Sequence, residues 1–136
     1  MAGDLRLSGF AVPEGIEALH DLLERVGSEH PDLAALDLSM FETAVIEIAN
    51  NVVEHGLPPG EVRWSFAVEV RPDRVVGVLT DDGQALPEGR PVADAEMPDV
   101  LAEDGRGLPL AHAVLDELDY TRDGRTNVWT MVRRRS

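Results

Sequence analysis

The segment from Ser39 to His55 constrains the fold of this 136-residue chain more than any other, because both of its ends can be read from the residues. Ser39 and Glu42 have the spacing of a capping box, in which each side chain satisfies a backbone amide of the other at a helix start. Gly56, expected in a left-handed cap conformation, and the prolines and glycine at 58–60 predict that the helix stops at about His55.

Three polar residues on this predicted helix, Glu47, Asn51 and His55, are spaced four apart and therefore share one face. The opposite arc is apolar and is expected to pack on a sheet; it carries Phe41, Val45, Ile48, Ala49 and Val52. A solvated helix face is one interpretation of the polar stripe. The functional interpretation is that Glu47 polarises a hydroxyl or water, that the Asn51 carbonyl coordinates Mg²⁺, and that His55 assists or only caps the helix end.

Hydrophobic periodicity and turn residues predict the other elements. A long segment at 81–104 lacks periodicity, which is typical of a lid or binding loop. The expected elements are a strand at Leu5–Phe10, a helix from Pro13 to Val26 ended by Gly27, antiparallel strands at Val62–Val70 and Val75–Thr80, a helix at Pro109–Asp116, and a hairpin of Leu118–Arg122 and Arg125–Arg133 turning at Asp123-Gly124.

Composition narrows the classes of function. The chain is 43% apolar and 28% charged, as expected for one globular domain over residues 1–136. A formal charge of −14 disfavours nucleic acid and anionic membranes as partners. The absence of Cys excludes disulfides, and with no apolar signal or membrane segment we expect a cytoplasmic protein. The absence of Lys excludes a Walker A loop, a eukaryotic-type protein-kinase site and Schiff-base chemistry.

Two further motifs suit a nucleotide, although each alone is a weak signal. Asp81 and Gly83 follow a predicted strand, where a carboxylate could accept a hydrogen bond from an exocyclic amine; a polar turn is the alternative. Gly105, Arg106, Gly107 and Leu108 open a predicted helix, whose free amides and positive end suit phosphate oxygens. The glycine pair does not follow a strand, so it is not a Rossmann fingerprint.

The order of these motifs resembles a known family. EIANNVVEH at 47–55, DDG at 81–83 and GRGLPLA at 105–111 are similar to the three sequence boxes of the GHKL ATP-binding domains of gyrase, histidine kinases and MutL. The resemblance is strongest to the small bacterial anti-sigma-factor serine/threonine kinases. It implies an α+β fold, a two-layer sandwich in which helices cover one face of a mixed, mainly antiparallel sheet, with an ATP lid at about 84–104.

The resemblance also implies roles for individual residues. Glu47 corresponds to the general base, Asn51 to the Mg²⁺ ligand and Asp81 to the group that reads the adenine amine. Gly83 corresponds to a residue that lets adenine approach, and Thr126 to a threonine that supports Asp81. The ATP-binding set further includes the residues His55, Gly105, Arg106, Gly107 and Leu108.

The chain departs from the family pattern at two positions. Ala85 replaces a glycine found in many members, which affects the shape of the loop, and Asp104 places a negative charge beside the expected phosphate site. Because the chain has no Lys, Mg²⁺, Arg106 and backbone amides would have to neutralise the phosphates.

Three functions stay open. The resemblance implies a regulatory kinase with three protein partners: a sigma factor that it sequesters, an anti-sigma-factor antagonist that it phosphorylates on Ser or Thr, and a second copy in a homodimer. The second is a catalytically silent module that uses ATP only to set its shape. The third is the catalytic domain of a histidine kinase, with His20-Asp21 resembling a phosphoacceptor site, although the apolar spacing of that helix already indicates core packing.

Overall fold

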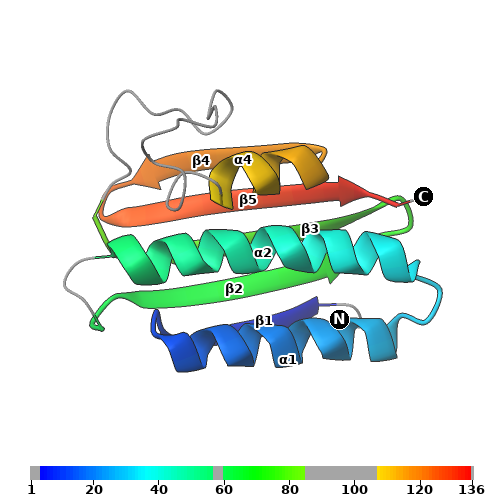
Figure 1. Ribbon diagram of the computed structural model, residues 1–136, viewed down its shortest axis with the longest axis horizontal. Helices are drawn as coiled ribbons and strands as arrows, with labels where there is room; N and C mark the ends of the chain where they lie inside the picture. The colour runs from blue at the N-terminus through cyan, green and yellow to red at the C-terminus, as the bar shows by residue number, and fades with distance from the viewer. Residues whose placement is uncertain (1–3, 57–59, 85–106, 136) are drawn as a thin grey trace.

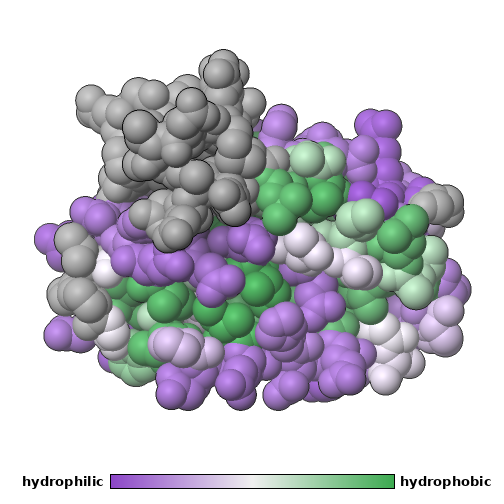
Figure 2. Space-filling view, viewed as in Figure 1, coloured by the Kyte–Doolittle hydropathy of each residue, from purple (hydrophilic) through white to green (hydrophobic). Residues whose placement is uncertain are grey.

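The computed structural model describes residues 4–56, 60–84 and 107–135. Within them, three helices cover one face of a five-stranded sheet, which confirms the two-layer α+β fold (Figure 1). The elements are β1 (Asp4–Phe10), α1 (Pro13–Glu29), α2 (Ala35–His55), β2 (Arg63–Val70), β3 (Arg74–Asp81), α4 (Gly107–Val114), β4 (Glu117–Asp123) and β5 (Thr126–Arg134). Seen from the helical side, the surface mixes hydrophilic residues with apolar residues (Figure 2).

The strands lie in the order β1-β2-β3-β5-β4, and every neighbouring pair is antiparallel. The described sheet is thus wholly antiparallel, where a mixed sheet was expected. Both predicted hairpins form, because each pairs two segments of alternating apolar residues across a short turn. In β3 this alternation buries Val75, Gly77 and Leu79 and, at the strand's last position, Asp81.

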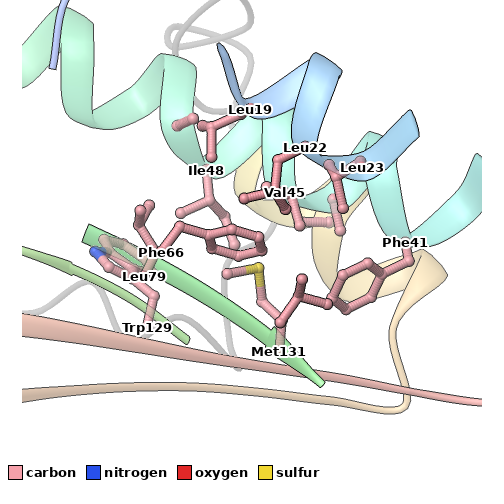
Figure 3. Close-up of a cluster of buried hydrophobic side chains, with 14 of the residues drawn as sticks. Leu19, Leu22, Leu23, Phe41, Val45, Ile48, Phe66, Leu79, Trp129 and Met131 are labelled. Carbon is pink, nitrogen blue, oxygen red and sulfur yellow. The ribbon is translucent and has the colours of Figure 1, made fainter. Parts of the chain in front are cut away.

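The core fills the space between the helices and the sheet (Figure 3). Residues that repeat at helical spacing on α1 and α2 contact alternate residues of the strands. The labelled side chains are Leu19, Leu22, Leu23, Phe41, Val45, Ile48, Phe66, Leu79, Trp129 and Met131. The predicted apolar arc of α2 therefore packs as expected.

The predicted capping box is wrong. Helix α2 begins at Ala35, so Ser39 lies inside it and its carbonyl accepts a hydrogen bond from Thr43 Oγ1 at 2.9 Å. The Glu42 carboxylate instead lies 2.6 Å from Nδ1 of His20 on α1. Neither residue therefore caps α2, which follows Ala34 without a side-chain cap.

Two glycines also differ from their predicted roles. Gly27 does not end α1, which runs on to Glu29; a Cβ there would lie 2.8 Å from Leu38 Cδ2, so the glycine permits close helix packing. Gly56 does follow the last residue of α2, but its φ of −69° is not left-handed. A Cβ at Gly56 would lie 2.7 Å from the Val52 carbonyl oxygen, so lack of space requires glycine at this position.

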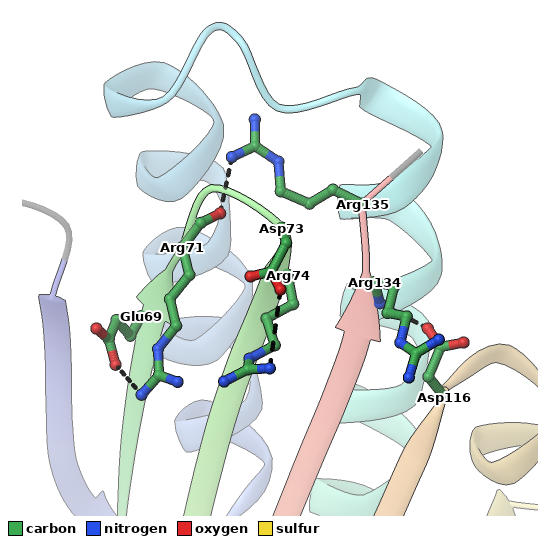
Figure 4. A network of polar contacts seen from close by, with 7 residues as sticks. All are labelled: Glu69, Arg71, Asp73, Arg74, Asp116, Arg134 and Arg135. Carbon is green, nitrogen blue, oxygen red and sulfur yellow. Dashed lines mark hydrogen bonds and ion pairs between the residues drawn. The ribbon is translucent and has the colours of Figure 1, made fainter.

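The C-terminal residues fasten the sheet at the β2–β3 turn (Figure 4). Arg135 donates its backbone N–H to the Asp73 carbonyl at 2.9 Å and a guanidinium N–H to the Arg71 carbonyl at 2.8 Å. This turn precedes β3, so it lies at the opposite end of that strand from Asp81. No helix in the described ranges is long and apolar enough to cross a membrane.

Candidate functional site

The polar stripe of α2 lies on one face, as its spacing predicts. Glu47 and Asn51 are half-buried and His55 is exposed. Within the described residues, neither the Glu47 carboxylate nor the Asn51 amide has a hydrogen-bond partner, whereas His55 Nε2 lies 3.9 Å from the neighbouring Glu54 carboxylate. The polar groups of Glu47 and Asn51 are therefore not used in side-chain hydrogen bonds within the described fold.

Asp81, at the end of β3, is 4% exposed, and three N–H groups donate to its carboxylate. Its Oδ1 accepts the Gly83 backbone N–H at 2.9 Å and an Asn127 amide N–H at 2.8 Å. Its Oδ2 accepts the Trp129 indole N–H at 3.3 Å. These bonds keep a carboxylate in place at a position where an unpaired one would be costly to bury.

Gly83 leaves little space for a side chain. A Cβ at this position would lie 3.1 Å from Asp81 Oδ1 and 3.4 Å from the methyl carbons of Val62. Glycine therefore lets the backbone approach the carboxylate and bond to it, which agrees with the short Asp81-Asp82-Gly83 motif being more than a solvated turn.

Asn127, which sequence reasoning missed, occupies the supporting position that was assigned to Thr126. It is 3% exposed and stands directly opposite Asp81 in the β3–β5 register. Thr126 pairs with Asp123 at the start of the β4–β5 hairpin, and its side chain points to the other face of the sheet. The sequence did contain a signal for Asn127: it lies two and four positions before Trp129 and Met131, so strand alternation places it on the same buried face.

Two residues of β4 complete this polar cluster. Arg122 Nη1 donates to Asn127 Oδ1 at 3.0 Å and to the Gly83 carbonyl at 2.8 Å. The Tyr120 hydroxyl also donates to Asn127 Oδ1, and the Tyr120 ring lies 4.7 Å from that of Trp129. We name the set Asp81, Tyr120, Arg122, Asn127 and Trp129 the carboxylate cluster.

The carboxylate cluster lies beside the end of α2. Gln84 Nε2 donates to the His55 carbonyl at 2.8 Å, and the Gln84 carbonyl accepts the second amide hydrogen bond of Asn127, also at 2.8 Å. The C-terminal end of α2 and the end of β3 lie at the left in Figure 1, and the start of α4 lies further in, above the middle of α2. The end of α2, the segment at 81–84 and the β4–β5 hairpin, which are distant in sequence, thus meet at one end of the sheet.

The second glycine motif is described only in part. Gly107 is the first residue of α4, Leu108 the second, and α4 packs against α2. Gly105, Arg106, Ala85 and Asp104 lie outside the described residues, as does nearly all of the expected lid.

Comparison with known proteins identifies the family. The model of the histidine kinase-like ATPase domain matches residues 11–133, which is nearly the whole chain. This chain belongs to the histidine kinase-like ATPase family. The family assignment agrees with the fold and makes the protein an ATPase domain of this type.

Thirteen chains of solved structures match, and one of them resembles the histidine kinase-like ATPase domain over almost its full length. It is the mycobacterial sensor histidine kinase MprB, with 20% sequence identity, a TM-score of 0.52, and coverage of 96% of this chain and 98% of that chain. At this identity the likeness concerns the fold. A search of curated proteins found no match.

The site residues of the ATPase domain suit a nucleotide carrying an amine. Each carboxylate oxygen can accept about two hydrogen bonds, so Asp81 Oδ2, with one donor at 3.3 Å, has room for another. Among the described residues no group of three His, Asp or Glu is placed to hold a metal ion by itself. Asn51 offers a single amide oxygen, which suits an ion that keeps several waters and binds phosphates.

Proposed function

We propose that this histidine kinase-like ATPase domain binds Mg-ATP where β3, α2 and α4 meet. The observation that carries the proposal is the buried Asp81 carboxylate, which is held by three donors and retains one acceptor position at Oδ2. That position suits the exocyclic amine of adenine, and the absence of a side chain at Gly83 suits a flat base. Asn51 serves as the Mg²⁺ ligand in this proposal.

The phosphates bind at the start of α4. Unpaired amides and the positive end of a helix favour anions there, so Gly105, Arg106, Gly107 and Leu108 contact phosphate oxygens. Bound Mg²⁺ supplies charge neutralisation for the phosphates. His55 contributes through its backbone carbonyl, which receives the Gln84 side chain and so connects the end of α2 to the loop after Asp81.

The reaction is phosphoryl transfer from ATP to a Ser or Thr hydroxyl of a small protein antagonist. The hydroxyl oxygen forms a bond to the γ-phosphorus, the bond from that phosphorus to the β-phosphate oxygen breaks, and ADP leaves. Glu47 accepts the hydroxyl proton as the general base. Among the described residues its carboxylate has no hydrogen-bond partner, so its oxygens are open to the hydroxyl.

The regulatory role rests on the resemblance of the three sequence boxes to anti-sigma-factor kinases. In that role the unphosphorylated antagonist and the sigma factor compete for binding to the domain. Phosphorylation of the antagonist makes the antagonist leave the domain.

Intact-protein mass spectrometry tests the kinase activity. Candidate antagonists incubated with the protein and Mg-ATP should gain one phosphate on Ser or Thr, and Glu47→Ala should abolish the gain. Glu54→Ala is the matched control, because Glu54 is exposed on the same helix. Tight ATP binding without transfer to any antagonist would instead support the catalytically silent module.

The histidine-kinase alternative makes a different prediction. His20 lies on α1, which buries Leu19, Leu22 and Leu23 within this domain, and its Nδ1 contacts Glu42 at 2.6 Å. Phosphohistidine is lost in acid, whereas phosphoserine and phosphothreonine survive. An acid-labile phosphate on this chain that disappears in His20→Ala would refute the serine/threonine assignment.

A further inference from the structure

The orientation of the Asn127 amide is fixed by its neighbours. Arg122 can only donate hydrogen bonds, so the atom that it contacts at 3.0 Å must be the Asn127 oxygen. The Asn127 NH₂ group therefore faces the other way, toward Asp81 Oδ1 at 2.8 Å and the Gln84 carbonyl at 2.8 Å. A chain of contacts thus runs from a cation on β4, through Asn127, to the buried carboxylate.

This orientation determines which Asp81 oxygen can meet a ligand. Oδ1 already accepts two N–H groups, from Gly83 and Asn127, which fills its capacity. Among the described residues Oδ2 accepts only the Trp129 indole N–H, at 3.3 Å, which leaves one acceptor position. If the Asn127 amide were absent, the carboxylate could rotate and exchange the roles of its two oxygens.

We propose that Asn127, oriented by Arg122, is a positioning residue that presents Asp81 Oδ2 to the amine of an adenine base and so sets selection against 6-oxo purines. The proposal rests on the nucleotide site proposed above and adds the residues that tune its base specificity. A purine with a carbonyl at position 6 would place a second acceptor oxygen against Asp81 Oδ2, and the two oxygens would repel each other. The same two residues hold the adjoining loop, since Arg122 and Asn127 both donate to carbonyls at 83–84.

A nucleotide-free measurement tests the positioning of Asp81. The chain contains two Trp residues, so the two indole N–H signals in an NMR spectrum report separately on Trp129, which bonds to Asp81, and on Trp64. Asn127→Leu, which replaces the amide with an apolar group of the same branching, should shift the Trp129 indole signal and leave the Trp64 signal in place. Thr121→Ala, an exposed change on the other face of β4, should move neither.

Calorimetry with Mg-ATP and Mg-ITP tests the base selection. Inosine triphosphate has the same phosphates as ATP but a carbonyl in place of the amine. Asn127→Leu should reduce the preference for ATP over ITP by about tenfold, the size expected for loss of a buried polar contact. Arg122→Leu should change the preference in the same direction by a smaller factor, and because Arg122 is exposed this variant serves if Asn127→Leu fails to fold.

The outcomes separate the positioning role of Asn127 from the proposed binding of Mg-ATP. An equal loss of ATP and ITP affinity would mean that Asn127 only supports the fold, and would overturn the proposal. If Asn127→Leu changes neither the Trp129 indole signal nor the preference for ATP over ITP, the proposal is also overturned. If the unaltered protein binds neither nucleotide, the proposed function fails; a shifted Trp129 signal would then still establish that Asn127 positions Asp81, and an unshifted one would reject that as well.

Discussion

Arg133, on β5, forms an ion pair with Asp37 in the first turn of α2. Two guanidinium nitrogens of Arg133, Nε and Nη2, each lie 3.2 Å from Asp37 Oδ1, and Nη1 donates to the Val114 carbonyl at the end of α4 at 2.7 Å. The Asp37 side chain is 1% exposed and that of Arg133 20%. The pair therefore fastens the start of one helix and the end of another to the sheet.

Asp37→Ala should lower the free energy of unfolding by about 3 kcal/mol, because it leaves the Arg133 guanidinium largely buried without its carboxylate. Urea unfolding followed by far-UV circular dichroism measures the change. Asp32→Ala is the control: the Asp32 carboxylate is 71% exposed, and Arg135 keeps its hydrogen bond to the Arg71 carbonyl, so the loss of stability should be much smaller. Equal effects of the two changes would contradict a structural role for the buried pair.

Gly77→Ala should destabilise the protein by about 1–3 kcal/mol, through overpacking. A Cβ on Gly77 would lie 2.7 Å from Phe41 Cζ and 3.1 Å from Phe66 Cε1, both in the core. Gly9→Ala, on the edge strand β1, has no atom within 4 Å of the added carbon and should be close to neutral. Thermal unfolding of the two variants distinguishes them, and a neutral Gly77→Ala would show that the aromatic rings move aside.

Asp32 should titrate at lower pH than an ordinary aspartate. The Arg135 hydrogen bond, reinforced by a backbone hydrogen bond, holds the pKa of the Asp32 carboxyl below its usual value. Because the folded-state pKa is depressed, the pair's contribution to stability is present above the unfolded-state pKa and is lost as pH falls through the folded-state pKa.

An NMR titration of the Asp32 carboxyl carbon measures this pKa. Arg135→Gln should raise the midpoint, and Arg25→Gln, on α1 where Arg25 pairs with Glu29, should leave it in place. An Asp32 midpoint that does not respond to Arg135→Gln would refute the assigned cause.

The sequence predicted the elements that depend on local pattern. Alternation in β2 and β3, with a short turn between them, was sufficient for their pairing, and the repeat on α2 was sufficient to separate its polar stripe from Phe41 and the other core residues. The start of α2 was predicted wrongly because its true determinants are distant. Asp37 is fixed by Arg133, 96 positions away, and Glu42 by His20 on another helix.

In the candidate site, too, the residues marked by local pattern could be predicted and those fixed by distant contacts could not. Asp81 and Gly83 could be singled out because they follow a predicted strand, but the residue that supports Asp81 could not be assigned without the register. Asn127 is 46 positions away from Asp81, and a shift of one residue along β5 exchanges it for Thr126, whose side chain faces the opposite side of the sheet.

Asn51 and Asp81 should affect nucleotide binding in different ways. Asn51→Ala removes the proposed Mg²⁺ ligand, so calorimetry should show weaker binding of Mg-ATP and little change for ATP measured in EDTA. Asp81→Ala removes the contact with the base, so binding should weaken by a similar factor with and without the metal. We expect a loss of at least about tenfold for each affected titration.

Asn50→Ala provides the control for this comparison. Asn50 is half-buried like Asn51, but it lies about 100° away around α2, off the polar stripe. If Asn50→Ala and Asn51→Ala weaken Mg-ATP binding equally, or if the effect of Asn51→Ala persists in EDTA, then the Asn51 amide oxygen is not the metal ligand. The polar stripe would in that case act through the shape of the helix surface, since no metal contact would connect it to the phosphates.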